Sequence, residues 1–244
     1  MKTLVLLAAG AGIRMRPLTE TIPKCLISVD GQTLLDGLLR HFTGLVDRTV
    51  VVTGHLHEQV ERHLATRKGA SELLTRHNPL YEVTNSLFSA AIARDAWSSS
   101  ESVIVSNTDV IFAAGALESL LGSDHDVVLS VDAKVCDAED MKVLLDETER
   151  IARVSKDLPP ERCLGEFTGV ARLQGHWVER FSKSIECLLR QPAMAESGWY
   201  DLALDQMAQE YSPLALEVVP EGSYWEIDTP NDLDVVKSRS SGTA

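Results

Sequence analysis

A glycine-rich turn followed by fixed positive charge stands near the start of the chain. Residues 6–26 read LLAAGAGIRMRPLTETIPKCL, in which two glycines precede Arg14, Arg16 and Lys24. Glycines let a backbone approach a ligand closely, and the exposed N–H groups of such a turn can donate to phosphate oxygens. The cations behind them match the charge that develops during phosphoryl transfer. These residue types in this order predict a nucleoside triphosphate site.

Other glycine turns fit this stretch less well. A dinucleotide-binding turn needs G-x-G-x-x-G, but Met15 stands where the third glycine belongs. A P-loop needs G-x-x-x-x-G-K followed by Ser or Thr, and the sequence does not contain this pattern. A structural turn with solvated arginines stays an alternative, although the joint presence of Arg14 and the pair Pro23-Lys24 weighs against it.

The composition argues against several classes of partner. The chain has 244 residues and a formal net charge of −13, which disfavours nucleic acid or an anionic membrane surface as the main partner. Its four cysteines show no C-x-x-C pairing, which favours reduced thiols in a cytoplasmic enzyme over a metal site. We expect no signal peptide, and the apolar runs are too short to span a bilayer.

Strand-length apolar runs alternate with helix-length amphipathic segments through the first half of the chain. This alternation predicts a Rossmann-like, three-layer α/β fold around a mixed, mostly parallel sheet, with ligands at the carboxyl ends of the strands. The expected strands are residues 3–9, 49–53, 72–76, 102–106 and 126–131, and the expected helices are residues 33–42, 57–65, 86–97 and 113–121.

The pattern changes after residue 132. We interpret the second half as a substrate-facing insertion on the same sheet, within one domain of residues 1–237, because no linker-like composition separates the halves. Residues 238–244 are rich in Ser and Gly and are predicted to be disordered. The expected elements are a hairpin of residues 141–146 and 151–155, strands 165–173 and 215–219, and helices 177–189, 202–209 and 230–236.

One carboxylate is well placed for the predicted triphosphate site. Asp109 follows the expected strand 102–106, so it should lie at the same edge of the sheet as the glycine turn. Mg²⁺ is commonly held by one or two carboxylates together with phosphate oxygens, which makes Asp109 a candidate ligand. The alternative is an ordinary Asn-Thr-Asp turn stabilised by local hydrogen bonds.

The glycine turn also resembles a known family motif. The run L-x-A-G-x-G-x-R-M-x-P-L-T followed by P-K-C-L is similar to the signature loop of nucleotidyltransferases that activate sugar 1-phosphates, phosphocholine and related phosphorylated alcohols. The resemblance implies a fold of the nucleotide-diphospho-sugar transferase type and a metal-dependent condensation that releases pyrophosphate. It assigns Arg14 and Lys24 to the phosphates as catalytic cations, and it assigns the nucleotide to the backbone of Leu7, Ala8, Ala9, Gly10, Ala11 and Gly12.

The family likeness extends to the metal ligands. The segment Asn107-Thr108-Asp109 resembles the family's N-G-D, whose Asp binds the metal, with Thr108 in place of glycine. The late segment E-I-D-T-x-x-D resembles the one that supplies the second metal carboxylate, which here is Asp228. The resemblance thus implies Mg²⁺ on Asp109 and Asp228. We expect Glu226 and Asp232 to be structural.

A third segment resembles one branch of the family. The pattern N-x-x-Y-x-x-x-N-S before a helix is similar to the phosphocholine and phosphonate cytidylyltransferases rather than to the sugar enzymes. Amide groups such as that of Asn85 match the donors and acceptors on a pyrimidine edge, although Asn85 or Ser86 could simply cap the next helix. The nucleotide-binding candidates here are Asn78, Thr84, Asn85 and Ser86, together with Thr108.

Candidates for the acceptor site lie in the second half. Lys142 and Lys156 resemble positions near the acceptor phosphate in the family, and the alternative is that each is a solvated hairpin lysine. Glu166 is a candidate contact for a cationic head group. Aromatic rings attract ammonium groups, and the chain offers Trp199, Tyr200, Tyr224 and Trp225, of which we select Tyr200 and Trp225; the alternative is core packing.

Together these features predict a Mg²⁺-dependent cytidylyltransferase. The enzyme would join CTP to a small phosphorylated alcohol, amino-alcohol phosphate or phosphonate, and pyrophosphate would leave. The first alternative is a sugar 1-phosphate nucleotidyltransferase that uses UTP, dTTP or GTP, and the second is a non-catalytic subunit of the same fold. The sequence does not fix the oligomeric state, and a homodimer is a working hypothesis.

Overall fold

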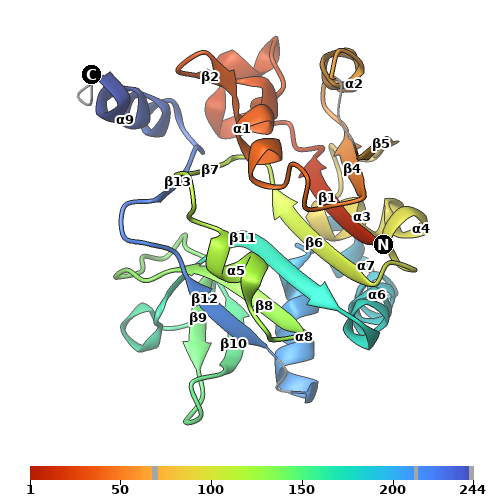
Figure 1. The fold of residues 1–244 in the computed structure, drawn as a ribbon, viewed down its shortest axis with the longest axis vertical. Helices are drawn as coiled ribbons and strands as arrows, with labels where there is room; N and C mark the ends of the chain where they lie inside the picture. Colours follow the sequence, from red (N-terminus) through yellow and green to blue (C-terminus); the bar gives the residue numbers. More distant parts are fainter. Residues whose placement is uncertain (68–70, 212–213, 242–244) are drawn as a thin grey trace.

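The core of the molecule is a mixed β-sheet. The computed structural model describes residues 1–67, 71–211 and 214–241. Within them, nine strands form one sheet, whose main path runs in the order β10-β9-β11-β6-β1-β4-β5, while β8 pairs with β11 and with β12. The parallel half (Figure 1) consists of β1 (Lys2–Ala8), β4 (Arg48–Thr53), β5 (Glu72–His77) and β6 (Ser102–Asn107).

The second half of the chain extends this sheet, as predicted. Its longest strand, β11, runs antiparallel to β6 on one side and to β8 and β9 on the other. β9 and β10 form the expected hairpin, and β12 pairs parallel with β8. The bounds are Val127–Asp132 for β8, Lys142–Leu145 for β9, Ile151–Ser155 for β10, Gly165–Gln174 for β11 and Ala215–Val218 for β12.

Helices cover both faces of the sheet because alternate side chains of each strand face opposite ways. In β1, Leu4 and Leu6 pack into a cluster with α1, α2 and α5, whereas Val5 and Leu7 pack into a cluster with α3, α4, α6 and α8. The three-layer arrangement is therefore confirmed. The helices are α1 (Leu34–His41), α2 (His57–Ala65), α3 (Ser86–Ile92), α4 (Arg94–Trp97), α5 (Glu118–Gly122), α6 (His176–Leu189), α7 (Pro192–Ser197), α8 (Asp201–Tyr211) and α9 (Pro230–Ser241).

Among the described helices, none combines the length and the apolar character that a bilayer crossing requires. All four cysteines lie in the described part of the chain, and all are free thiols.

Three sequence predictions about helices were wrong in detail. The helix expected over residues 86–97 is divided into α3 and α4, and the Trp97 indole nitrogen donates to the Ala90 carbonyl at 3.1 Å across the break. The helix expected over residues 113–121 begins only at Glu118, because Gly115 has a φ of +81° and the residues around it form a turn instead of a helix. Residues 238–241 belong to α9, which Leu233 and Val236 anchor in a small core, and residues 242–244 lie outside the described part.

A short ribbon next to β6 was not predicted. It pairs β7 (Val110–Phe112) with β13 (Tyr224–Glu226), so that Tyr224 lies opposite Phe112 and Glu226 lies opposite Val110. Directly after it, the Ile227 N–H donates to the Asp109 carbonyl at 2.8 Å. The ribbon brings the late part of the chain to the end of β6, as Figure 1 shows. A strand of three residues carries too little pattern to be found in a sequence.

Candidate active site

A cleft of about 390 Å³ opens at the carboxyl ends of β1 and β6, which is the edge that the sequence predicts. Most of the predicted site residues line it. They are Leu7, Ala9, Gly10, Arg14, Asn78, Thr84, Asn85, Ser86, Asp109, Lys156, Glu166, Tyr200 and Asp228. The other predicted residues, Ala8, Ala11, Gly12, Lys24, Thr108, Lys142 and Trp225, do not line the cleft.

The signature loop is held in shape by its own contacts. Gly12 has a φ of +59°, and a Cβ there would lie 2.9 Å from Cγ2 of Thr19. The Thr19 hydroxyl donates to the Gly12 carbonyl at 2.7 Å, which ties the two ends of the loop together. A short 3₁₀ turn, Ile13–Met15, buries Met15 and leaves Arg14 facing the cleft. The glycine is therefore needed for conformation and space.

The two predicted cations meet the two predicted carboxylates. The Lys24 ammonium lies 2.7 Å from Oδ2 of Asp109 and 2.5 Å from Oδ1 of Asp228. The Arg14 guanidinium lies 2.6 Å from the other oxygen of Asp228. Burial opposes the charge of Lys24, but attraction and hydrogen bonds from both aspartates outweigh it, so the pKa of Lys24 is raised. Lys24 thus lies beneath the cleft and joins both carboxylates.

Glu226 joins the two aspartates, which sequence reasoning missed. One oxygen from each of Asp109, Glu226 and Asp228 lies within 4.8 Å of the others. Burial, followed by the nearby charges of Asp109 and Asp228, raises the pKa of Glu226 to about 8. The available signal was the spacing of Glu226 and Asp228, because residues two apart in an extended segment share a face.

These carboxylates have the chemistry of a divalent metal site. Oδ1 of Asp109 is buried, and it accepts no hydrogen bond from any residue that the structure describes. Carboxylate oxygens suit a hard cation such as Mg²⁺, and a buried oxygen without a donor is suited to a metal ligand. Asp109, Asp228 and Glu226 therefore fit the metal that the family resemblance implies. Asp232 accepts from the backbone N–H groups of residues 228 and 229, which is a structural role.

The predicted amide segment forms one wall of the cleft. The Asn78 side chain is occupied, because it donates to Thr84 and Ser89 and accepts from the Leu80 N–H at 2.9 Å. Asn85 accepts from the Ser86 N–H at 2.9 Å and so caps α3, as the structural alternative proposed. Its amide nitrogen makes no hydrogen bond to a described residue, which leaves that donor for a ligand in the cleft.

Thr108 joins two strands beneath the cleft. Its hydroxyl donates to the Leu7 carbonyl at 3.1 Å, which links the end of β6 to the end of β1. The Thr108 side chain is buried. The Ala8 side chain packs in the cluster with α1, α2 and α5, on the other face of the sheet from Leu7 and Ala9. Thr108 and Ala8 support the floor of the site through the backbone.

Lys142 is a structural lysine, and its predicted position beside the acceptor was wrong. Only 1% of the residue is exposed, and its ammonium donates to the carbonyls of Asp137, Ala138 and Asp140 at 2.9, 3.2 and 3.1 Å. Strand alternation in β9 turns the side chain under the loop of residues 137–140. The sequence could not distinguish this orientation from one that faces the cleft.

We expect Lys142→Met to destabilise the protein by about 3 kcal/mol, because three carbonyls would lose the charged donor of a buried lysine. Urea unfolding of both proteins would measure the loss. Lys156→Met is the matched control, since Lys156 makes no buried set of carbonyl contacts among the described residues. An equal, small loss in both variants would contradict the structural role.

The end of the cleft that we predict to hold the acceptor is rich in carboxylates. Glu166 lines this end of the cleft, but its carboxylate is paired with Lys134 at 2.8 Å, and Lys134 also contacts Asp140 at 3.0 Å. Burial raises the pKa of Glu166, although Lys134 opposes the shift. The Lys156 ammonium lies over the ring of Trp199, 4.3 Å from its centre. Both groups at this end of the cleft therefore already have a partner.

Asp201 is a cleft residue that sequence reasoning missed. It begins α8 and is only 5% exposed, and its Oδ2 accepts no hydrogen bond from a described residue. Burial is the main reason that its pKa is raised to about 7. An aspartate at a helix start usually acts as a cap, so the sequence carried no signal for another role.

The predicted aromatic contacts have different positions. Tyr200 lines the cleft but is almost fully buried; its hydroxyl donates to the Gly169 carbonyl at 2.8 Å, and its N–H donates to the Ser86 hydroxyl at 3.0 Å. Trp225 was wrongly predicted to face the acceptor. Tyr224 and Glu226 face the cleft, so Trp225, which lies between them on β13, faces the opposite side.

The three-dimensional comparison defines the class of fold. A solved structure described as CTP:phosphocholine cytidylyltransferase from Streptococcus pneumoniae matches with a TM-score of 0.82 at 18% identity, over 98% of this chain and 99% of that one. The fold is therefore that of the nucleotidyltransferases of the nucleotide-diphospho-sugar transferase type, as the sequence predicts.

The chain belongs to the family of MobA-like NTP transferase domains, whose sequence model matches residues 4–138. A CMP-5′-(3-aminopropyl)phosphonate synthase of Streptomyces rubellomurinus is 26% identical over 93% of this chain and 37% of that protein. A bifunctional IPC transferase and DIPP synthase of Aquifex aeolicus is 27% identical over 100% of this chain and 53% of that protein. The chain thus spans about half or less of the length of these curated relatives.

Proposed function

We propose that this protein is a cytidylyltransferase that joins CTP to a small phosphate or phosphonate carrying an ammonium group. The observation that carries the proposal is the convergence of Arg14 and Lys24 on Asp109 and Asp228 at the mouth of the glycine loop. The relatives named for aminopropylphosphonate and phosphocholine chemistry support the choice of CTP and of an amino acceptor. Mg²⁺ dependence, a homodimeric state and a cytoplasmic location stay predictions.

The proposed reaction forms one phosphorus–oxygen bond and breaks another. An acceptor oxygen attacks the α-phosphorus of CTP, and the bond from that phosphorus to the bridging oxygen breaks as pyrophosphate leaves. Because the attacking oxygen is already anionic, the chain need not supply a strong base. When bound by the three carboxylates, Mg²⁺ would neutralise phosphate charge. Arg14 and Lys24 would hold the phosphate oxygens and balance the charge that builds between them.

Asp201 is the best candidate for the acceptor ammonium. Glu166, which we first expected to contact the cation, is neutralised by Lys134 in the structure. Asp201 instead lines the cleft with a buried oxygen that has no donor among the described residues. An ammonium group that donates to this oxygen would satisfy it and balance its charge.

Pyrophosphate release tests the proposal directly. The full chain is incubated with Mg²⁺ and each of CTP, UTP, dTTP, ATP and GTP, against phosphocholine, phosphoethanolamine, aminoalkylphosphonates and sugar 1-phosphates. We expect turnover with CTP and an amino acceptor, and Arg14→Ala should abolish it while the protein stays folded. Turnover with sugar 1-phosphates alone would reject the acceptor class, and turnover that is unchanged by Arg14→Ala would reject the site.

The contribution of Asp201 should depend on pH. With a pKa of about 7, its carboxyl group is mostly neutral at pH 6 and mostly charged at pH 8. The charged fraction rises from about one tenth to about nine tenths over this range. We therefore expect the ratio of the acceptor KM of Asp201→Asn to that of the wild type to increase about tenfold from pH 6 to pH 8.

Comparing the two proteins at each pH removes the acceptor's own ionisation, because that change affects both equally. Steady-state kinetics with an acceptor that carries a quaternary ammonium keeps the ligand charge fixed. A ratio that stays constant with pH would show that Asp201 does not contact the cation.

A further inference from the structure

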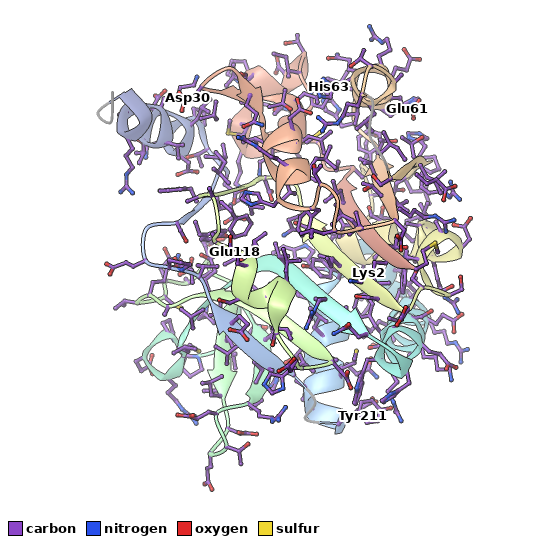
Figure 2. All side chains as sticks on the ribbon, viewed as in Figure 1. Lys2, Asp30, Glu61, His63, Glu118 and Tyr211 are labelled. Carbon is purple, nitrogen blue, oxygen red and sulfur yellow. The ribbon has the colours of Figure 1, made fainter. Side chains whose placement is uncertain are left out.

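A second, larger cavity lies behind the ribbon of β7 and β13. Its volume is about 680 Å³, and α1, β7, β13 and α9 enclose it, together with the turn between β2 (Ser28–Val29) and β3 (Gln32–Thr33). Asp30 marks that turn, on the side of α9 (Figure 2). Among the residues that the structure describes, none lines both this cavity and the cleft. The volume is in the range of about 300–1,000 Å³ that small-molecule sites occupy.

The lining of this cavity combines rings with fixed positive charge. Trp225 and Phe112 contribute aromatic surface, and Leu34 and Leu38 contribute aliphatic surface. Arg40 lies in the lining, and its guanidinium forms no hydrogen bond or ion pair with any described residue. In a chain with a formal net charge of −13, a cavity that presents an arginine of this kind favours an anion.

Gly37 keeps one wall of the cavity open. It lies inside α1, where glycine costs about 1 kcal/mol relative to alanine. The usual reasons for glycine are absent at this position: its φ is not positive, and the nearest atoms to an added Cβ, in Gln32, lie 3.9 Å away. The effect of this glycine is to leave the face of α1 without a side chain where it borders the cavity.

We propose that this cavity is a second ligand site, which takes an organic anion that carries a ring. The ring would pack against Trp225 and Phe112, and the anionic group would lie at Arg40. The inference goes beyond the proposed function, because it does not depend on which nucleotide or acceptor the cleft binds.

Occupancy of this site would be sensed in the cleft through β13. Trp225 lies between Tyr224 and Glu226 on β13. Ile227, directly after this strand, donates its N–H to the Asp109 carbonyl. A ligand that packs on Trp225 therefore contacts the strand that positions two of the three clustered carboxylates. Coupling between the two sites would be allosteric. Its free energy would be given by the ratio of the affinities that one site has for its ligand when the other site is occupied and when it is empty.

The test uses 1-anilinonaphthalene-8-sulfonate, a ring-bearing anion whose fluorescence increases on binding. The full chain is titrated with this probe in the presence of saturating CTP, which keeps the cleft occupied. We expect one site, with the affinity reduced about tenfold by Gly37→Leu, which fills the cavity, and by Arg40→Glu, which reverses its charge. Gly122→Leu is the matched control, because Gly122 is also a helical glycine with open space around it, and it lies outside the cavity lining.

Gly37→Leu should also raise the melting temperature slightly, since leucine favours a helix over glycine. If that variant does not fold, Arg40→Glu alone decides the question. Equal affinity for the probe in Gly122→Leu, Gly37→Leu and Arg40→Glu would overturn the proposal. Displacement of the probe by CTP, with unchanged probe affinity in Gly37→Leu and Arg40→Glu, would place the probe in the cleft and would also overturn the proposal.

Discussion

Asp228→Asn should reduce pyrophosphate release by about 10³-fold while the protein remains folded. Asp228 accepts from Arg14 with one oxygen and from Lys24 with the other, and it is one of the three clustered carboxylates. The amide has almost the same shape but no charge, so it can neither balance both cations nor serve as an anionic metal ligand. Single-turnover assays with saturating CTP would measure the loss.

Asp234→Asn is the control for this substitution. Asp234 lies on the exposed side of α9, so its substitution by Asn changes the charge by the same amount outside the cleft. Its activity should equal that of the wild type. If both variants keep full activity, Asp228 has no part in the reaction. If both lose it, the charge of this region rather than the site would be responsible.

The second large effect is expected for Lys24→Met, which should lower turnover and raise the affinity for a divalent metal ion. Turnover should fall about 10³-fold, because the ammonium that balances phosphate charge is removed. The affinity for Mn²⁺ without nucleotide should instead rise, since the ammonium lies 2.7 and 2.5 Å from oxygens of two carboxylates that would bind the metal. Removing a competing cation from two carboxylates favours another cation there.

Electron paramagnetic resonance of free Mn²⁺ measures that affinity without relying on catalysis. Lys156→Met is the matched control, because Lys156 lines the cleft over Trp199, away from the three carboxylates, and its loss should leave Mn²⁺ binding unchanged. If Lys24→Met binds Mn²⁺ no tighter than the wild type, the lysine does not compete for the metal oxygens. If no variant binds Mn²⁺ with or without CTP, the metal requirement itself is rejected.

The sequence predicted the parts of the fold that have strong periodicity. β1 and β6 were recognised as buried strands, and parallel strands end at the same edge, so the meeting of the glycine loop with Asp109 could be expected. Asp228 lies 204 residues beyond Lys24, and only the resemblance of its segment to a family motif placed it in the site. Local propensity carries no information about such a contact.

The errors share a physical cause, which is the orientation of single side chains. The sequence does not show that Lys142 turns under its own loop or that Lys134 neutralises Glu166. It also does not show which face of the ribbon Trp225 occupies, because β7 and β13 are too short to show alternation. Asp201 escaped notice because its free oxygen results from tertiary packing around α8.

The hydrogen bond from Tyr200 to Ser86 has a mechanical consequence. It joins the start of α3, in the wall predicted to bind the nucleotide, to the segment before α8, in the wall predicted to bind the acceptor. The Leu87 N–H also donates to the Gly198 carbonyl of the latter segment at 3.1 Å. These two hydrogen bonds therefore link the two walls of the cleft directly. We therefore expect the separation of these two walls to change little when substrates bind between them.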